Sequence, residues 1–219
     1  VSILQSSSKN KRIRTKITTV LVVLADKVLE IFDSSGTLKS FSSLDTLDLS
    51  CCWKLGVQAA KLVGDLLNET KISNLVLGGE GNHRCNLEDD GLKCILEASN
   101  AKQLVQLSVG GGFTQAGYDD IASFIRREDT QLQILDVNMP KTYNPIGMSI
   151  EDIQCMFIDS IRTTSKLELI TIRDTHCAPT DVVKEKLLKL VCNTESIQSL
   201  IDSNHRFFSI AHEWGGSGL

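Results

Sequence analysis

The chain has 219 residues, of which 42% are hydrophobic, 23% are charged and three are prolines. This composition excludes an intrinsically disordered segment and indicates one folded unit with a substantial core. The formal net charge of −4 argues against broad binding to phosphate backbones, which requires clustered positive charge, so we expect no nucleic-acid partner.

The amino-terminal region combines a basic arm with an apolar run. Residues 1–16 are polar and carry a basic cluster, for which a solvated arm is favoured over a nuclear-import signal or an anionic contact. The apolar run 17–25 is similar to the core of a secretory signal, but apolar residues continue at helical spacing to Ile31, which favours an amphipathic helix. The run is shorter than the roughly 20 residues of a membrane-spanning helix, so we expect no membrane partner. Because the chain starts at Val1 rather than Met, we expect a fragment or a processed product.

The seven cysteines are odd in number and follow no regular spacing. Several of them lie in apolar periodic segments, where a free thiol behaves as a small core residue. We therefore expect an intracellular, reducing compartment, cytoplasmic or nuclear, rather than a disulfide framework.

One pattern of apolar residues, spaced three and then two positions apart, occurs six times along the chain. The copies start at positions 44, 72, 104, 132, 167 and 197, at intervals of 28, 32, 28, 35 and 30. They read Leu44-x-x-Leu47-x-Leu49, Ile72-x-x-Leu75-x-Leu77, Leu104-x-x-Leu107-x-Val109, Leu132-x-x-Leu135-x-Val137, Leu167-x-x-Ile170-x-Ile172 and Ile197-x-x-Leu200-x-Asp202, the last of which loses its final apolar residue. The spacing predicts a repeat protein in which each copy forms a short strand that packs on neighbouring units.

Helical patterns separate the predicted strands. Apolar residues at i, i+3, i+4 and i+7 predict helices over 56–67, 91–96, 117–125, 150–161 and 182–191. Ser149 and Thr180 stand where N-caps are expected, because their hydroxyl oxygens can accept hydrogen bonds from the free amides of the first turn. Asp152 and Asp181 add negative charge near the positive end of the helix dipole. Strands joined by helices require parallel pairing with crossover connections, so we expect an α/β fold.

The Leu-x-x-Leu-x-Leu strand followed by a glycine-led helix resembles the leucine-rich repeat family, in its long-repeat, ribonuclease-inhibitor-like branch. The resemblance covers residues 17–205, leaves 1–16 as an arm and 206–219 as a tail, and implies a horseshoe solenoid with a parallel concave sheet and convex helices. The last repeat is also similar to divergent repeats in predicted proteins of microbial eukaryotes. The chain departs from the family three residues beyond the last position of each strand motif, where Asn or Cys is usual. Only Cys52 matches there, and the other positions hold Glu80, Gly112, Pro140, Thr175 and His205.

Residues with catalytic or metal-binding potential form no recognisable site in the sequence. His83-Arg-Cys85 and His176-Cys177 lack the paired spacing of zinc ligands, and no Ser, His and Asp set can be assembled from local motifs. We therefore expect no enzyme, no metal and no cofactor.

The glycine runs 78–81 and 110–112 lack the Lys-Ser or Lys-Thr of a P-loop, and we expect them to supply positive φ angles where strands turn. A GTPase-activating leucine-rich repeat domain is the alternative, with Arg84 or Arg173 as its charge-stabilising finger.

Side chains one position away from the buried leucines point to the opposite, concave face of the sheet. We predict a non-catalytic module that recognises another protein through this face. Solvated strand residues without a partner, or a purely structural solenoid, are the alternatives. The predicted contacts are Thr46, Asp48, Asn74, Val76, Gln106, Ser108, Ile134, Asp136, Leu169, Thr171 and Arg173, with Ser199, Ile201 and Ser203 from the sixth strand. A rim loop over residues 138–149 offers Tyr143 as a second contact.

Overall fold

The computed structural model describes residues 45–50, 56–77, 87–110, 112–138, 149–161, 166–173, 179–201 and 209–211. Within these ranges strands alternate with helices, so the chain is an α/β protein. The strands are β1 (Thr46–Asp48), β2 (Asn74–Val76), β3 (Gln106–Gly110), β4 (Ile134–Asn138), β5 (Leu169–Arg173) and β6 (Ser209–Ala211). The helices are α3 (Val57–Glu69), α4 (Asp89–Leu96), the 3-10 turn η3 (Ala101–Gln103), α5 (Gln115–Arg126), α6 (Ile150–Ser160), α7 (Asp181–Val191) and α8 (Ile197–Ile201). The predicted amino-terminal helix lies outside the described residues.

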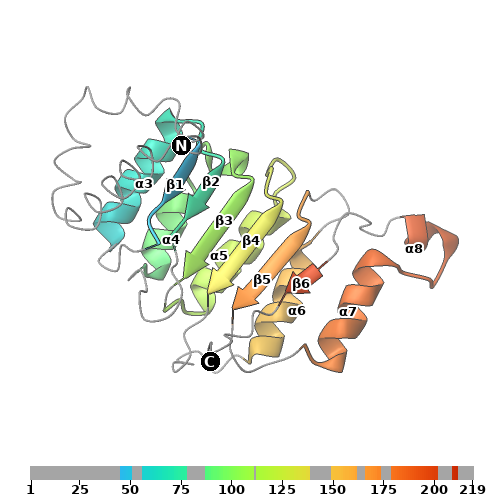
Figure 1. Cartoon of the computed structure of the whole chain (residues 1–219). Coiled ribbons are helices and arrows are strands. Elements are labelled where there is room, and N and C mark those ends of the chain that lie inside the picture. Colours follow the sequence, from blue (N-terminus) through green and yellow to red (C-terminus); the bar gives the residue numbers. More distant parts are fainter. Residues whose placement is uncertain are drawn as a thin grey trace, which may run out of the picture.

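The six strands form one parallel sheet in the order of the sequence, β1 to β6 (Figure 1). Each of the first five begins two residues after the first apolar residue of its motif, so five of the six predicted strands are confirmed. The register aligns the middle residues of the first five motifs, and each of these side chains is buried. They are Leu47, Leu75, Leu107, Leu135 and Ile170. The sequence pattern therefore marks equivalent positions on neighbouring strands.

The same backbone arrangement joins each unit to the next. The carbonyl oxygen just before a strand accepts two amides from the next unit, one from the residue before the next strand and one from that strand's first residue. Asp45 O accepts from Ser73 N and Asn74 N at 2.9 and 3.1 Å, and the arrangement recurs with the carbonyl oxygens of Ser73, Val105 and Gln133. Because this pattern is repeated at four consecutive joins, the loops enter the sheet with one common geometry.

Helices α3 to α7 form a layer in which each helix packs against the next, and Figure 1 shows α4 and α5 behind the sheet. All five predicted helices are confirmed, with ends within two residues of the prediction. The fourth residue after the N-cap is buried in four successive helices, α3 to α6, with an exposed fraction of 2% or less. These residues are Ala60, Leu92, Tyr118 and Ile153. The buried stripe of each helix therefore faces the same core as the buried strand residues.

Both predicted N-caps are confirmed. Ser149 forms a capping box with Asp152: Ser149 Oγ accepts from Asp152 N at 3.1 Å, and Asp152 Oδ2 accepts from Ser149 N at 2.9 Å. Hydrogen bonds from the hydroxyl and amide of Ser149 hold the pKa of Asp152 below its usual range. Thr180 caps α7 through an acceptor bond from Val183 N, and Asp181 lies in the first turn of that helix. The helix boundaries are thus fixed by local side-chain chemistry.

Glycine has a different structural role from the predicted one. Gly112, after β3, does not have a positive φ, so the expectation of a left-handed turn is wrong at this residue, while the run 78–81 lies outside the described residues. Two glycines stand instead where the helix layer is closely packed. A Cβ on Gly117 would collide with Asp89 Oδ1 and lie 3.0 Å from Phe113 Cβ, and one on Gly91 would lie 2.8 Å from Leu87 Cδ1.

The sixth predicted strand is wrong. Residues Ile197–Ile201 form helix α8, and the sixth strand is β6, which falls within the predicted tail. Ser196 Oγ accepts the amide of Ser199 at 2.9 Å, as an N-cap does. Ile197 and Leu200 are three residues apart, which suits a helix as well as the strand motif, and Asp202 replaces the final apolar residue. Ser199 and Ile201 are therefore not on the sheet, and Ser203 lies outside the described residues.

Candidate partner-binding face

The side of the sheet opposite the buried motif residues is the candidate functional site, called here the open face. Two rows of side chains cross it, as the strand register requires. The first row is Thr46, Asn74, Gln106, Ile134 and Leu169, and the second is Asp48, Val76, Ser108, Asp136 and Thr171. Neighbouring strands in a sheet lie about 4.8 Å apart, so each row forms a continuous line of side chains across five strands.

Most of the open face is accessible, as alternation along the strands predicts. Asp48 is exposed, and the other members are half-buried except for two. Ser108 is only 5% exposed and Thr171 only 7% exposed. Both are small side chains set between neighbouring strands, and Ser108 Oγ donates to Asp136 Oδ2 at 3.4 Å. They offer a partner almost no surface, which corrects the prediction for these two residues.

The first row changes character along its length. Its β1–β3 part is polar, and there Asn74 Nδ2 donates to Thr46 Oγ1 at 3.2 Å. Its β4–β5 part consists of Ile134 and Leu169, which are register partners on adjacent strands and are both half-buried. The open face therefore has a polar half, able to exchange hydrogen bonds, and an apolar pair, able to be covered by another apolar group.

The second row carries negative charge. Asp48 and Asp136 are its ionisable members, and none of the described side chains in the two rows is a lysine or arginine. Asp48 Oδ1 accepts the amide of Ser50 at 3.0 Å, so that carboxylate already has one fixed donor. A ligand that lies across the open face consequently meets carboxylates beside apolar surface.

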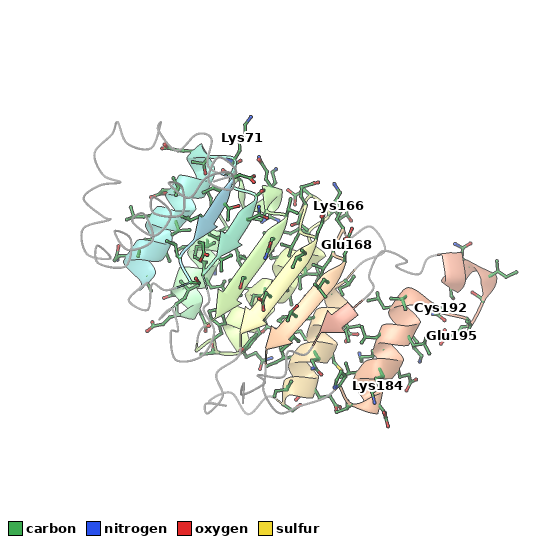
Figure 2. All side chains as sticks on the ribbon, viewed as in Figure 1. Lys71, Lys166, Glu168, Lys184, Cys192 and Glu195 are labelled. Atoms are coloured by element: carbon green, nitrogen blue, oxygen red, sulfur yellow. The ribbon has the colours of Figure 1, made fainter. Side chains whose placement is uncertain are left out.

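Lysines and acids lie together at the end of the sheet where the strands begin, with Glu168 beside Lys166 in Figure 2. Figure 2 shows Lys71 and Lys166 at this end, near the starts of β2 and β5. Lys71 is exposed, and Lys166 hydrogen-bonds to Gln131 Oε1. The sequence-based prediction did not single out these lysines. The available signal was that each lysine stands immediately before the first apolar residue of a strand motif, Ile72 or Leu167.

Several predicted site residues cannot be placed on the open face. Tyr143 and the rim loop lie outside the described residues apart from the loop's two ends, and so does Arg84, one of the two candidate arginine fingers. Arg173 ends β5, where the structure describes its backbone but not its side chain. The second contact surface and the GTPase-activating alternative therefore remain predictions.

The described residues contain no arrangement that points to metal chemistry. No group of three or more His, Cys, Asp or Glu side chains within them could hold a metal ion, and His83 and His176 lie outside them. The cysteines that the structure describes are free: Cys94, Cys155 and Cys192. Burial raises the pKa of the Cys155 thiol, which keeps it protonated and a weak nucleophile.

None of the helices in the described ranges is long and apolar enough to cross a membrane. Comparison with known proteins adds no family: no protein-family model matches the chain, and no curated protein matches it. What the open face does must therefore be inferred from its own geometry.

Proposed function

We propose that the chain is a leucine-rich-repeat-like solenoid that acts as a non-catalytic recognition module and binds another protein through the open face. The repeat assignment is supported by the motif register across β1–β5 and by the identical joins between successive units. Such repeats cannot bury a strand's apolar side alone, so stacking produces a long sheet with one side free. The free side is the natural contact surface of this architecture.

The observation that carries the proposal is the apolar pair Ile134 and Leu169 on the open face. Both side chains are half-buried rather than covered, although the middle residues of the same two strands, on the other face, are fully buried. Adjacent apolar side chains on an accessible sheet tend to mark an interaction patch, unlike single scattered ones. In protein interfaces, a few such anchors contribute most of the binding energy.

The surroundings of the apolar pair indicate the chemistry of the partner. Asp136 is on the same strand as Ile134 and two residues further along, so it points to the same side of the sheet. Asp48 adds a second carboxylate at the β1 end of the same row. A partner with an apolar side chain flanked by lysine or arginine would complement this face, because opposite charges favour encounter and orientation.

An intracellular location, cytoplasmic or nuclear, belongs to the same proposal. The free thiols of Cys94, Cys155 and Cys192 support it, because cysteines of secreted proteins are usually paired.

The proposal is tested by affinity capture from cell extract, with the bound proteins quantified by mass spectrometry. The test variant is the double change Ile134→Asp, Leu169→Asp, which places charge on the apolar pair. The matched control is Gln58→Asp, Ser123→Asp, which adds the same charge at exposed positions of α3 and α5. Circular dichroism and thermal unfolding establish that all three proteins are folded.

We expect the wild type and the control to capture the same proteins, and the double variant to lose them by about tenfold or more, which corresponds to about 1.4 kcal/mol. Equal capture by all three proteins would contradict binding through the open face. Equal losses in the test and control variants would point to general charge repulsion instead of a specific site.

A further inference from the structure

Two side-chain amides on the open face have hydrogen-bonding groups that the described part of the chain leaves unused. Asn74 and Gln106 are register partners on β2 and β3, and both are half-buried. Asn74 Nδ2 donates to Thr46 Oγ1 at 3.2 Å and to Ser73 Oγ at 3.1 Å, which fixes the orientation of this amide. No described residue donates to Asn74 Oδ1, and the side-chain amide of Gln106 forms no hydrogen bond within the described ranges.

These amides restrict what can cover the apolar pair. Gln106 is the register neighbour of Ile134, so a ligand that covers Ile134 also excludes water from the Gln106 amide. A polar group that loses its water without gaining a new partner opposes binding. The ligand therefore has to supply a donor for Asn74 Oδ1, and both a donor and an acceptor for Gln106.

The main chain of a peptide carries the required groups, because each residue other than proline has one N–H donor and one C=O acceptor. An α-helix uses these groups in its own hydrogen bonds, so its main chain cannot pair with Asn74 and Gln106. In an extended segment the same groups are free. The amide pair therefore favours an extended peptide over a helix.

The two ends of the open face differ in chemistry. At β4 and β5, Ile134 and Leu169 offer apolar surface. At β1, Asp48 is exposed, and its carboxylate accepts the Ser50 amide at 3.0 Å but forms no ion pair with any described residue. Charge complementarity thus favours a lysine or arginine of the ligand at the β1 end, and an apolar side chain at the other. Such a ligand would bind in one direction only.

The width of the sheet sets the spacing between these two ligand residues. Figure 1 shows β1 to β5 side by side in this order. From β1 to the midpoint between β4 and β5 is about 17 Å, at about 4.8 Å for each step between strands. An extended chain advances about 3.3 Å per residue, so about five residues cover this distance. The main chain between the two ligand residues then crosses β2 and β3, where the amide pair lies.

We propose that the open face recognises an extended peptide segment of its partner, an inference that rests on the proposed function. An apolar residue of the segment covers Ile134 and Leu169, and a lysine or arginine about five residues away lies beside Asp48. The main chain between them exchanges hydrogen bonds with the amides of Asn74 and Gln106. Because the recognised element is a short linear segment, an isolated peptide is sufficient for binding.

Selection of short random peptides on the 219-residue chain, followed by calorimetric titration of the selected peptides, tests this inference. We expect the selected peptides to share an apolar and a basic residue about five positions apart. Gln106→Ala should weaken their binding by about three- to tenfold, because it removes the amide. The matched control is Gln58→Ala, which removes the same group from the exposed side of α3 and should leave the affinity unchanged. N-methylation of the peptide's central amides should also weaken binding.

A second pair of variants tests the charged end. Asp48→Asn removes the charge and keeps an acceptor for the Ser50 amide. In the wild type, replacing the basic residue of the peptide by glutamine should weaken binding, and in Asp48→Asn the same replacement should have no further effect. The control Asp65→Asn, at an exposed position of α3, should behave as the wild type does. A basic residue that contributes equally with and without Asp48 would contradict the assigned direction.

The outcomes separate this inference from the proposed function. If no peptide binds, while capture from cell extract is lost only in the Ile134→Asp, Leu169→Asp variant, the proposed function stands and the linear segment is wrong. Selected peptides without the shared spacing would overturn the inference too. So would peptides that bind Gln106→Ala and Gln58→Ala equally well, or that bind equally to the wild type and to the Ile134→Asp, Leu169→Asp variant.

Discussion

The inner units of the stack and its carboxyl-terminal end contain similar apolar side chains that are buried to different extents. Between β2 and α6, apolar residues at the strand centres and at fixed distances from the N-caps are buried on all sides. At α7 Leu188 is 62% exposed, and the side of this helix that faces the core carries Val183, with Leu187 and Leu190 partly buried against it. In a repeat architecture, stability depends on each unit together with its neighbours. The position of a residue in its own repeat therefore does not determine how much free energy it contributes.

The largest expected difference is between truncations of a central strand and of the last helix. Leu135 in β4 is fully buried, so Leu135→Ala should lower the free energy of unfolding by about 2–5 kcal/mol. Leu188→Ala should change it by about 0.5 kcal/mol or less, because the Leu188 side chain is 62% exposed. Chemical denaturation of both variants measures the two values. Similar losses would contradict the contrast between the inner units and the end.

The ionisation of Tyr118 probes burial between inner helices. Burial in the core, with a smaller contribution from Asp89, raises the pKa of Tyr118 from 10.0 to about 12. The unfolded chain releases this proton at lower pH than the folded one, so the contribution to stability is complete below pH 10 and is lost as the pH rises to about 12. The loss should be about 2–3 kcal/mol, at about 1.4 kcal/mol for each pKa unit.

Absorbance titration of a Tyr143→Phe variant, which keeps Tyr118 as the only one of the two tyrosines, measures that pKa directly. In Tyr118→Phe the alkaline loss of stability should be smaller by the same amount. A titration of Tyr118 near pH 10 would mean that the space between α5 and its neighbours is open to water.

Two glycines test how closely the inner layer is packed. Gly117→Ala places a methyl group against Asp89 and Phe113. Overpacking costs about 1–3 kcal/mol, and the better helix propensity of alanine offsets about 1 kcal/mol of this, so a net loss of up to about 2 kcal/mol is expected. Gly112→Ala meets no atom within 4 Å and has no positive φ to strain it, so it should be neutral or slightly stabilising. Thermal unfolding of the two variants measures this difference in stability.

The N-caps provide the smallest expected difference in stability between the inner units and the carboxyl-terminal end. Ser149→Ala removes half of the capping box of α6, a helix packed on both sides, and should cost about 1 kcal/mol of unfolding free energy. Ser196→Ala removes the equivalent bond from the five-residue α8 and should not change global unfolding measurably. It should instead increase the hydrogen exchange of the Ser199 amide. A large global effect of Ser196→Ala would show that α8 belongs to the cooperative core.

Much of the fold could be predicted because strand centres and helix starts are specified locally. The motif fixed five strands, and hydroxyl residues such as Ser149 and Thr180 fixed helix starts. The sequence-based predictions fail where residues that are distant in the sequence but adjacent in space determine the local structure. Ile197 and Leu200 satisfy helical and strand spacing alike, and the cap at Ser196 and the polar Asp202 distinguish the two. The burial of the small Ser108 on the open face depends on the adjoining strands, which the repeat motif does not encode.

The most direct test of the central claim, that the open face binds the partner, is site-specific photo-cross-linking. A photoreactive amino acid is placed in turn at Gln106, in the middle of the first row, and at Ser123, on the exposed side of α5 next to it in the chain. Irradiation of each protein in cell extract should give a partner adduct from position 106 and none from position 123. Adducts from position 123 alone, or equally from both, would contradict recognition through the open face.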